Sequence, residues 1–531
     1  MNWSGVCRRT AACLLAAGAV LLGACGGSSE PVSAQGGGSP GTGGSCASGL
    51  SGGVIAPTLP VTDINPLLAL ANAQLAPMLQ PVVLDCPSMQ PVPQAVCDED
   101  SQPLNNGVQG RVTLADMQSA QAAQGWTCNL KVVSRFSTPG GFRVWSYTDP
   151  QGHTCAYYDT SFAGGTTAAI SLGGGPTPGV VVLDMSNPAS PVQTAMLTDS
   201  LAMLIPHESL NLNARRGLLA ADVGNAATLP GEMAIYDIRS DCRHPQLKGQ
   251  LPTITGHESG FSPDGNTFWV AGGFGYITAV DVSDPSKPKE VWRGTYNSHG
   301  LNLSDDGNTL YHTDTINGNF GLIDVSQIQA RASNPQVHDI SRVSWPTATI
   351  PQNSSPFTSG GHRYLLEFEE FAFRFNPATV QDSPGAARIL NIDDPAHPTI
   401  VSNIRLAVNM QEQHRAADLD PYPLAANAAL GYAFHYCAIP SEDNPQIAAC
   451  STLNSGLRVF NIGDPAHPRE VAYYVAPPNA GNLTGSLVPG LLSGDLAFSQ
   501  PAFNAAQRQI WYTDAVSGFY ALQLSPQAWP Q

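Results

Sequence analysis

Residues 277–285, Ile277-Thr-Ala-Val-Asp-Val-Ser-Asp-Pro285, decide the fold of this chain. They form a short apolar strand that ends in a turn built on Asp-Pro, after which a second strand begins. Because one such unit cannot bury its apolar face alone, repetition of the unit predicts a stacked or radially closed array. The phrase recurs, with variations, at Val180–Pro188, Met233–Ile238, Phe320–Ser326, Arg388–Pro395 and Leu457–Pro465.

Four antiparallel strands can be built outward from the copies, with turns such as Pro263-Asp-Gly265 between them. The last unit offers only three strands, within 496–524, and Asn129–Phe136 supplies the fourth. Closing a ring in this way protects the sheet edges. We therefore expect an all-β, seven-bladed β-propeller with a partly helical N-terminal extension; the alternative is an open β solenoid. The other units are expected near 142–197, 207–251, 257–294, 299–343, 362–404 and 414–475.

The composition fits a turn-rich β protein. Of 531 residues, 52 are Gly and 44 are Pro, whereas charged residues make up only 12%. The formal net charge of −17 argues against nucleic acid as a partner, since phosphate binding needs a basic face.

The N-terminus predicts export. Arg8 and Arg9 precede a short apolar run, and Leu22-Gly-Ala-Cys25 resembles the lipobox of bacterial lipoproteins, in which the Cys is acylated. Residues 1–25 are thus expected to be a lipoprotein signal peptide, whose alternative is a plain signal peptide with a chance Cys. The protein would then sit in the envelope of a Gram-negative bacterium, as an outer-membrane lipoprotein that is periplasmic or surface-exposed.

Three further segments are expected after the signal peptide. Residues 26–55 are a Gly/Ser-rich tether. Residues 56–125 are a partly helical cap segment, with helices at Pro66–Leu75 and, capped by Thr113, at Leu114–Ala123. Residues 126–531 are the propeller.

The cysteines agree with an oxidising compartment. Of 11 Cys, Cys7 and Cys13 lie in the signal peptide and Cys25 carries the lipid, so eight remain for disulfides. We expect the near-neighbour pairs Cys86–Cys97, Cys128–Cys155 and Cys437–Cys450, which leaves Cys46 with Cys242.

The Asp-Pro phrase resembles the LVIVD-repeat family of bacterial β-propellers. Asp281-Val-Ser-Asp-Pro-Ser-Lys-Pro288 is the copy that resembles it most, and Gly256–Ser259 and His435-Tyr-Cys437 resemble motifs of an exported subgroup. The resemblance covers roughly 126–530 and implies fold and export, but no agreed activity. Asn391 and Asn461 depart from the family's Asp.

A series of histidines is the candidate functional site. Each lies just before, or at, the expected first strand of a blade, where first strands line the central channel, and His435 is expected at the end of a second strand on the same face. Imidazoles around one axis suit a transition metal such as Cu, Fe or Zn. The candidate metal or ligand residues are His207, His257, His299, His362, His414, His435, Glu208 and Glu258.

A structural role for these histidines is the competing interpretation. In WD-repeat propellers a His at the same turn bonds an Asp near the end of the second strand, and Asp222, Asp314 and Asp514 are available for such pairs. The acidic run Glu367, Glu369 and Glu370 is expected to be a solvated strand edge.

Two functions follow from these alternatives. The first is a lipid-anchored propeller that serves as a binding platform for a protein, glycan or small molecule. The second is a periplasmic metal-dependent enzyme, an oxidoreductase by class, with its site in the histidine-lined funnel. The Gly-x-Ser-x-Gly pattern of a nucleophile elbow occurs only in the Gly/Ser-rich tether, at Gly37–Gly41 and Gly49–Gly53, and not in a strand-turn-helix setting.

Overall fold

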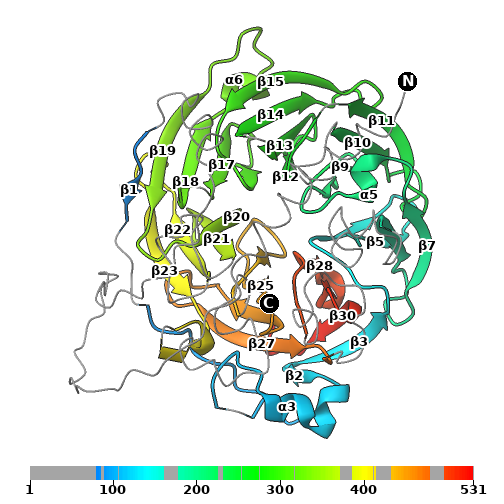
Figure 1. Cartoon of the computed structure of the whole chain (residues 1–531), viewed down its shortest axis with the longest axis vertical. Helices are drawn as coiled ribbons and strands as arrows, with labels where there is room; N and C mark the ends of the chain where they lie inside the picture. Colours follow the sequence, from blue (N-terminus) through cyan, green and yellow to red (C-terminus); the bar gives the residue numbers. More distant parts are fainter. Residues whose placement is uncertain are drawn as a thin grey trace, which may run out of the picture. The chain divides into compact units, whose positions relative to one another are not determined.

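A computed structural model describes residues 79–84, 89–105, 107–160, 178–224, 231–252, 254–273, 275–315, 317–370, 385–410, 412–413, 432–478 and 495–529. Seven sheets follow one another round a ring (Figure 1), which confirms the seven-bladed β-propeller. Within each blade, strands adjacent along the chain pair antiparallel. In the part of the chain that the structure describes, no helix is long and apolar enough to cross a membrane.

In each blade the first-named strand lies innermost and the later strands follow outward. Blade 1 is β4 (Val144–Thr148), β5 (Thr154–Asp159), β6 (Val180–Asp184) and β7 (Val192–Leu197); blade 2 is β8 (Asn211–Asn213), β9 (Leu218–Asp222), β10 (Glu232–Asp237) and β11 (Gln246–Pro252). Blade 3 is β12 (Glu258–Phe261), β13 (Thr267–Gly273), β14 (Tyr276–Asp281) and β15 (Lys289–Thr295); blade 4 is β16 (Leu301–Leu303), β17 (Thr309–Asp314), β18 (Asn319–Asp324) and β19 (His338–Ser344), with β1 (Val82–Val83) parallel to β19.

Blade 5 is β20 (Ile350–Ser359), β21 (His362–Glu370), β22 (Ala387–Asn391) and β23 (Thr399–Ile404). Blade 6 is β24 (Tyr436–Ala438), β25 (Ile447–Ser451), β26 (Leu457–Asn461) and β27 (Arg469–Val475), extended by β2 (Trp126–Cys128). Blade 7 is β28 (Ala502–Asn504), β29 (Gln509–Asp514), β30 (Gly518–Leu524) and β3 (Leu130–Phe136). The described helices are α3 (Leu114–Gln118), η2 (Ala120–Ala123), α5 (Leu201–Leu204), α6 (Ser326–Gln329), η4 (Ala407–Asn409) and η6 (Ala505–Gln507).

The repeated phrase forms the third strand of a blade and the turn to its fourth. In that turn Asp284 accepts a hydrogen bond from the backbone N–H of Ser286 at 3.0 Å, and Asp394 and Asp464 accept equivalent bonds at the same distance. Such Asx turns explain why Asp precedes Pro in the phrase. The register also shifts within the third strand of blades 1 to 6, as at Ala279/Val280, and such irregularities increase the local twist.

Ring closure is as the sequence predicts. Strand β3 pairs with β30, so the strand expected at Asn129–Phe136 completes blade 7. The first strand of that blade is β28, whereas the expected Leu496–Ser499 makes only isolated bridges through Ala497.

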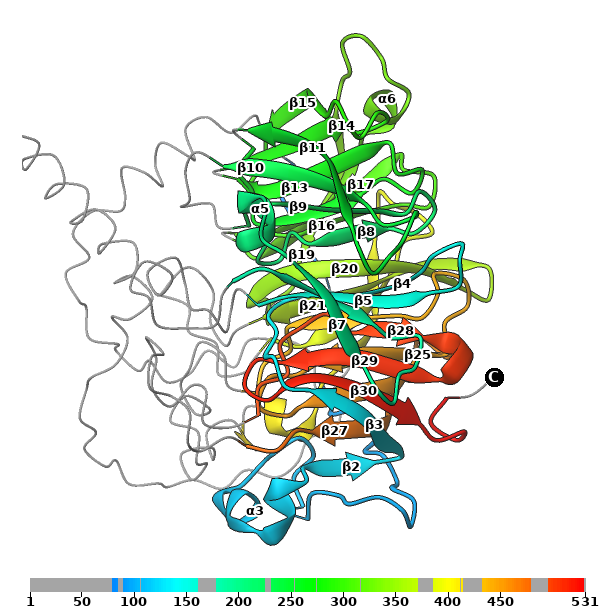
Figure 2. The same ribbon diagram turned by 90° about the vertical axis from the view of Figure 1, so that its right-hand side faces the viewer.

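The N-terminal segment packs on the outer edge of blade 6. Figure 2 shows α3 beside β2, which pairs with the outermost strand β27. Thr113 caps α3 as expected, but the helix ends at Gln118 and a 3-10 turn follows. The helix expected at Pro66–Leu75 lies outside the described residues.

Blades 5 and 6 begin elsewhere than the sequence suggested. The first strand of blade 5 is β20, not a strand at His362, and the first described strand of blade 6 is β24. Residues 350–359 contain Pro351 and Pro356, and proline is disfavoured inside a strand. Proline is tolerated there because β20 is an edge strand of its sheet.

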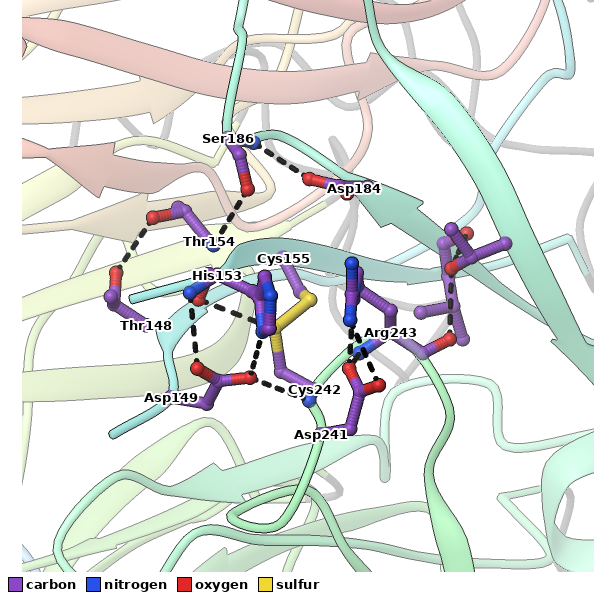
Figure 3. The surroundings of a disulfide bond; sticks show 12 residues. Thr148, Asp149, His153, Thr154, Cys155, Asp184, Ser186, Asp241, Cys242 and Arg243 are labelled. Carbon is purple, nitrogen blue, oxygen red and sulfur yellow. Dashed lines mark hydrogen bonds and ion pairs between the residues drawn. A yellow bond between two sulfur atoms is a disulfide. The ribbon is translucent and has the colours of Figure 1, made fainter. Parts of the chain in front are cut away.

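The described residues contain three disulfides: Cys97–Cys128, Cys155–Cys242 and Cys437–Cys450. The last was predicted, whereas the pairings Cys86–Cys97, Cys128–Cys155 and Cys46–Cys242 are wrong; Cys46 and Cys86 lie outside the described residues. Cys155 on β5 meets Cys242 in the turn between β10 and β11 (Figure 3), although 87 residues separate them. Neighbouring blades bring them together, which proximity along the sequence does not reveal.

Candidate metal centre

Four histidines and two glutamates converge at one mouth of the propeller channel. They come from the residues that enter the inner strands of blades 2, 3, 4 and 6 and from the end of β21 in blade 5. The histidines are His207, His257, His299 and His435, and the glutamates are Glu208 and Glu370.

Three of these donors surround one point. The Nε2 atom of His257 lies 2.9 Å from the Nε2 atom of His299 and 2.9 Å from Oε2 of Glu208. The third side of the triangle, His299 Nε2 to Glu208 Oε2, is 3.6 Å. Ligand bonds of about 2.1 Å with tetrahedral or octahedral angles place donors about 3.0–3.4 Å apart. The spacing therefore fits a single ion held by two imidazoles and a carboxylate.

A second group of donors adjoins the first. The Nε2 atom of His435 lies 3.2 Å from Oε1 of Glu208 and 3.3 Å from Oε2 of Glu370. The other oxygen of Glu370, Oε1, is 3.5 Å from His299 Nε2. Gln352 donates from Nε2 to Oε1 of Glu208 at 2.8 Å. Each carboxylate is thus shared between the two groups.

Two histidines are oriented by backbone carbonyls. Nδ1 of His257 is 3.0 Å from the carbonyl oxygen of Gly224, and Nδ1 of His435 is 2.6 Å from that of Phe498. Since a carbonyl only accepts, each Nδ1 carries the proton, and in the neutral ring Nε2 then presents a lone pair to the cluster. This arrangement is typical of metal-ligating histidine.

His207 is held in a strained conformation beside the cluster. Its backbone φ of 51° is in the left-handed region, which costs of order 1 kcal/mol or more for a non-glycine residue. Its Nδ1 lies 4.0 Å from Oε2 of Glu208, is buried and has no hydrogen-bond partner within the described residues. Strain of this kind persists where surrounding structure imposes it, so His207 is a further candidate ligand.

The pKa shifts of the histidines show which protons a bound cation would replace. Burial lowers the pKa of His257, but the neighbouring Glu208 outweighs it and raises the pKa to about 9. Burial likewise opposes protonation of His435, whose bonds to Glu208 and Glu370 raise its pKa to about 9. Burial and the charge on His257 lower the pKa of His299 to about 3. In the metal-free cluster, protons on two imidazoles thus balance the buried carboxylates.

Glu258 supports the cluster from behind. Its carboxylate is fully buried and accepts from Arg143 at 2.5 Å, from Asn353 at 2.7 Å and from the hydroxyl of Tyr436. Burial raises the pKa of Glu258 to about 7, with Arg143 opposing that rise. Because Glu258 and Tyr436 follow His257 and His435 in the chain, this network fixes two ligand-bearing strand starts. The sequence predicted Glu258 as a ligand, whereas its contacts make it a positioning residue.

Two predicted histidines take no described part in the cluster. His362 begins β21, about 26 Å along that strand from Glu370 at roughly 3.3 Å per residue. Its side chain is 60% exposed and its Nδ1 lies 2.6 Å from Asp393. The prediction for His362 is wrong because the first strand of blade 5 was misplaced. His414 lies outside the described residues.

His435 reaches the predicted face for a different reason. It precedes the first strand of blade 6, β24, rather than ending a second strand. It therefore occupies the position that His207, His257 and His299 take in their own blades. The position expected for His414 is filled by His435.

Glu370 and Gln352 were missed by the sequence reasoning. The run from Glu367 to Glu370 was expected to be a solvated edge, but its side chains are buried, and Glu367 and Glu369 pair with Arg388. Strand alternation places Glu370 on the face opposite Glu367 and Glu369. This period of two in the sequence could have indicated that Glu370 has a different role from the other two glutamates.

The aspartates that the structural interpretation assigns to these histidines do not pair with them. Within the described residues, Asp222 has no hydrogen-bond partner for either carboxylate oxygen. Asp314 binds Asn317, Asn319 and Arg342, and Asp514 binds backbone N–H groups and Ser517. None of the three therefore forms the expected pair with a histidine of the series.

A second group of His and Asp residues differs from the channel cluster, because protein donors satisfy its carboxylates. Asp149, His153 and Asp241 lie together beside the Cys155–Cys242 disulfide (Figure 3). There His153 bonds Asp149, and the carboxylate of Asp241 is held by Arg243 at 2.9 and 3.1 Å. Protein donors already satisfy these acids, so this group is structural.

Comparison with known proteins supports the family. The LVIVD repeat model matches residues 177–197 and 263–297, which include two copies of the Asp-Pro phrase. The chain carries LVIVD repeats. No curated protein sequence matches it significantly.

Solved structures resemble this LVIVD-repeat propeller only distantly. The Myceliophthora thermophila Cps50 (Swd1) β-propeller domain is 11% identical with a TM-score of 0.46, covering 74% of this chain and 99% of that one. The periplasmic gluconolactonase PpgL of Pseudomonas aeruginosa is 13% identical with a TM-score of 0.42, covering 66% and 92%. A chain of the mitotic checkpoint complex is 10% identical with a TM-score of 0.44, covering 74% and 95%.

Proposed function

We propose that this LVIVD-repeat propeller is a metal-dependent enzyme whose transition-metal centre lies at the mouth of its channel. One observation carries the proposal: the Nε2 atoms of His257 and His299 and Oε2 of Glu208 converge at 2.9–3.6 Å. Two imidazole lone pairs and a carboxylate oxygen repel one another at these distances unless a proton or a cation lies between them.

The donor set favours an iron-type oxidoreductase. Two histidines and one carboxylate on one side of an ion, with the other positions open, are the ligands of non-haem iron(II) enzymes that activate dioxygen. The His257 side chain is 25% exposed and that of His299 is 12% exposed, so the cluster is reachable from solvent. A purely structural ion is closed off by four protein ligands. Copper and zinc are the other ions that imidazole suits.

The chain's own residues have separate tasks in this proposal. His257, His299 and Glu208 hold the ion, which supplies the binding and polarisation of a small oxygen ligand. Gln352 orients Glu208 by donating to Oε1. Arg143 and Glu258 fix the start of β12 and thereby His257.

Metal content tests the proposal. Protein purified from cells, and protein incubated with Fe(II), Cu(II) or Zn(II) and then dialysed, should hold at least one ion per chain. His257→Ala and Glu208→Gln should lose that ion, whereas His362→Ala, which removes an exposed histidine outside the cluster, should keep it. Folded wild-type protein that takes up none of the three metals would overturn the proposal and leave a binding platform.

The open position has its own test. Nitric oxide binds ferrous iron at a vacant position and serves as a dioxygen surrogate. Iron-loaded wild type should give the EPR signal of a ferrous nitrosyl complex. Iron-loaded protein without that signal would contradict an oxygen-activating role.

We also propose export and lipid anchoring at Cys25, which attaches the protein to the outer membrane of a Gram-negative envelope. The lipobox-like Leu22–Cys25 supports this, as do the three disulfides, which form in oxidising compartments. Labelled palmitate should enter the wild type and not Cys25→Ser. Equal labelling of the two proteins would refute the anchor.

A further inference from the structure

We infer that the cluster takes two metal ions, bridged by Glu208 and Glu370. This inference rests on the proposed metal centre and deepens it. It starts from the way the carboxylate oxygens are shared. Oε2 of Glu208 faces His257 and His299, while Oε1 faces His435 at 3.2 Å. Glu370 divides in the same manner, with Oε1 toward His299 at 3.5 Å and Oε2 toward His435 at 3.3 Å.

This division defines two adjacent metal subsites. Subsite 1 has His257, His299, Glu208 Oε2 and Glu370 Oε1, with His207 beside it. Subsite 2 has His435, Glu208 Oε1 and Glu370 Oε2. A carboxylate that gives one oxygen to each of two ions is a bridge, and paired ions in enzymes lie about 3.5–4 Å apart. One ion could not use both oxygens of both glutamates and all these imidazoles at bond distances of about 2 Å.

The buried charge of the cluster also matches two cations, which would replace the protons on His257 and His435. Glu208, Glu258 and Glu370 are almost wholly buried, and Arg143 is the guanidinium that faces them, at Glu258. Uncompensated buried carboxylates are costly, because burial removes their hydration.

The lining of subsite 2 is built for a ligand rather than for packing. His435 is completely buried, and the carbonyl of Phe498 holds its Nδ1, so Nε2 points to the two glutamates. The rings of Phe498 and Tyr436 lie against it, with centroids 4.0 and 4.7 Å away. Such a fixed imidazole, between two carboxylates and shielded by aromatic rings, is a preorganised metal ligand.

Two adjacent ions would widen the chemistry of the site. A pair can hold a bridging water-derived nucleophile or clamp both ends of a small oxygen-containing substrate. The substrate class that fits is therefore a small oxyanion or dioxygen, reaching the cluster on the side of His207 and His257, the more exposed ligands.

Stoichiometry separates this inference from the proposed function. Chelator-treated protein is loaded with Fe(II) under anaerobic conditions, and in parallel with Zn(II), and bound metal is counted after dialysis. We expect two ions per wild-type chain for at least one metal, one for His435→Ala, and two for the control His362→Ala. One ion per wild-type chain with both metals would overturn the second subsite and leave the proposed function intact. No ion with either metal would overturn this inference, and no ion with Cu(II) as well would overturn the proposed function.

The bridge is tested by EPR of the iron-loaded protein after oxidation in air. Two ferric ions bridged by carboxylates couple magnetically, so the wild type should show almost no high-spin ferric signal. His435→Ala, with one ion, should show a strong one. A wild-type signal that accounts for two independent ferric ions would overturn the bridge. If His435→Ala fails to fold by circular dichroism, Glu370→Gln replaces it.

Discussion

The buried pair of Arg143 and Glu258 offers the sharpest test of how this fold supports its site. The two side chains are 3% and 0% exposed and their nearest atoms are 2.5 Å apart. Arg143→Met removes the cation and leaves the Glu258 carboxylate with Asn353 and Tyr436 as its donors. Breaking a buried pair from one side costs about 3–5 kcal/mol, because the buried carboxyl must then stay charged without its cation or take up a proton.

The expected size can be expressed as a melting temperature. The entropy of unfolding is about 2.1 cal/mol/K per residue, or roughly 0.8 kcal/mol/K for a propeller of roughly 400 residues. A loss of about 3–5 kcal/mol therefore lowers the Tm by about 4–6 °C. Replacing the carboxylate as well, in Arg143→Met/Glu258→Gln, should recover most of this loss, since neither charge of the pair is then left.

Calorimetry on chelator-treated protein is the assay, so that bound metal does not alter the stability. The control is Arg293→Met, which breaks a pair with Glu290 at 2.6 Å whose side chains are 40% and 38% exposed. Exposed pairs contribute about 0–1 kcal/mol, so the Tm of this control should change by about 1 °C or less. An Arg143→Met variant no worse than the control, or a double variant as unstable as the single one, would refute the reasoning.

Further predictions concern packing, acid stability and the disulfides. A Cβ on Gly300 would lie 1.9 Å from Glu258 Oε2 and 2.2 Å from the carbonyl oxygen of Gln352. Gly300→Ala should therefore lower the free energy of unfolding by about 1–3 kcal/mol and weaken metal binding, measured by equilibrium dialysis, at least tenfold. Unchanged metal binding would contradict this close packing. Burial lowers the pKa of His312 well below 6.5, so the unfolded chain binds its proton first and stability falls as pH drops below 6.5. His312→Leu should reduce the difference in Tm between pH 7 and pH 5 by roughly 2 °C, because one such histidine changes the free energy of unfolding by about 1.4 kcal/mol per pH unit below 6.5. An unchanged difference would show that other groups cause the loss of stability in acid. Replacing Cys155 and Cys242 by Ala, which unlinks blades 1 and 2, should cost about 2–5 kcal/mol in calorimetry, and an unchanged Tm would argue against that bond.

The sequence determined the architecture because local chemistry repeats in it. Asp-Pro turns and alternating strands are properties of neighbouring residues, so the number of blades and the closing strand β3 could be predicted from them. The position before an inner strand also identified His207, His257 and His299 correctly as neighbours, since that position recurs in each blade.

The tertiary structure alone decided which side chains complete the site. Glu370 ends a second strand and His435 begins a first, yet ring closure brings both to Glu208 from 162 and 227 residues away in sequence. The same closure joins Cys155 to Cys242 and leaves His362 at the far end of β21. Strand pairing depends on local periodicity, whereas the meeting of strand ends from five blades depends on how the blades pack around one axis. No short stretch of sequence encodes that packing.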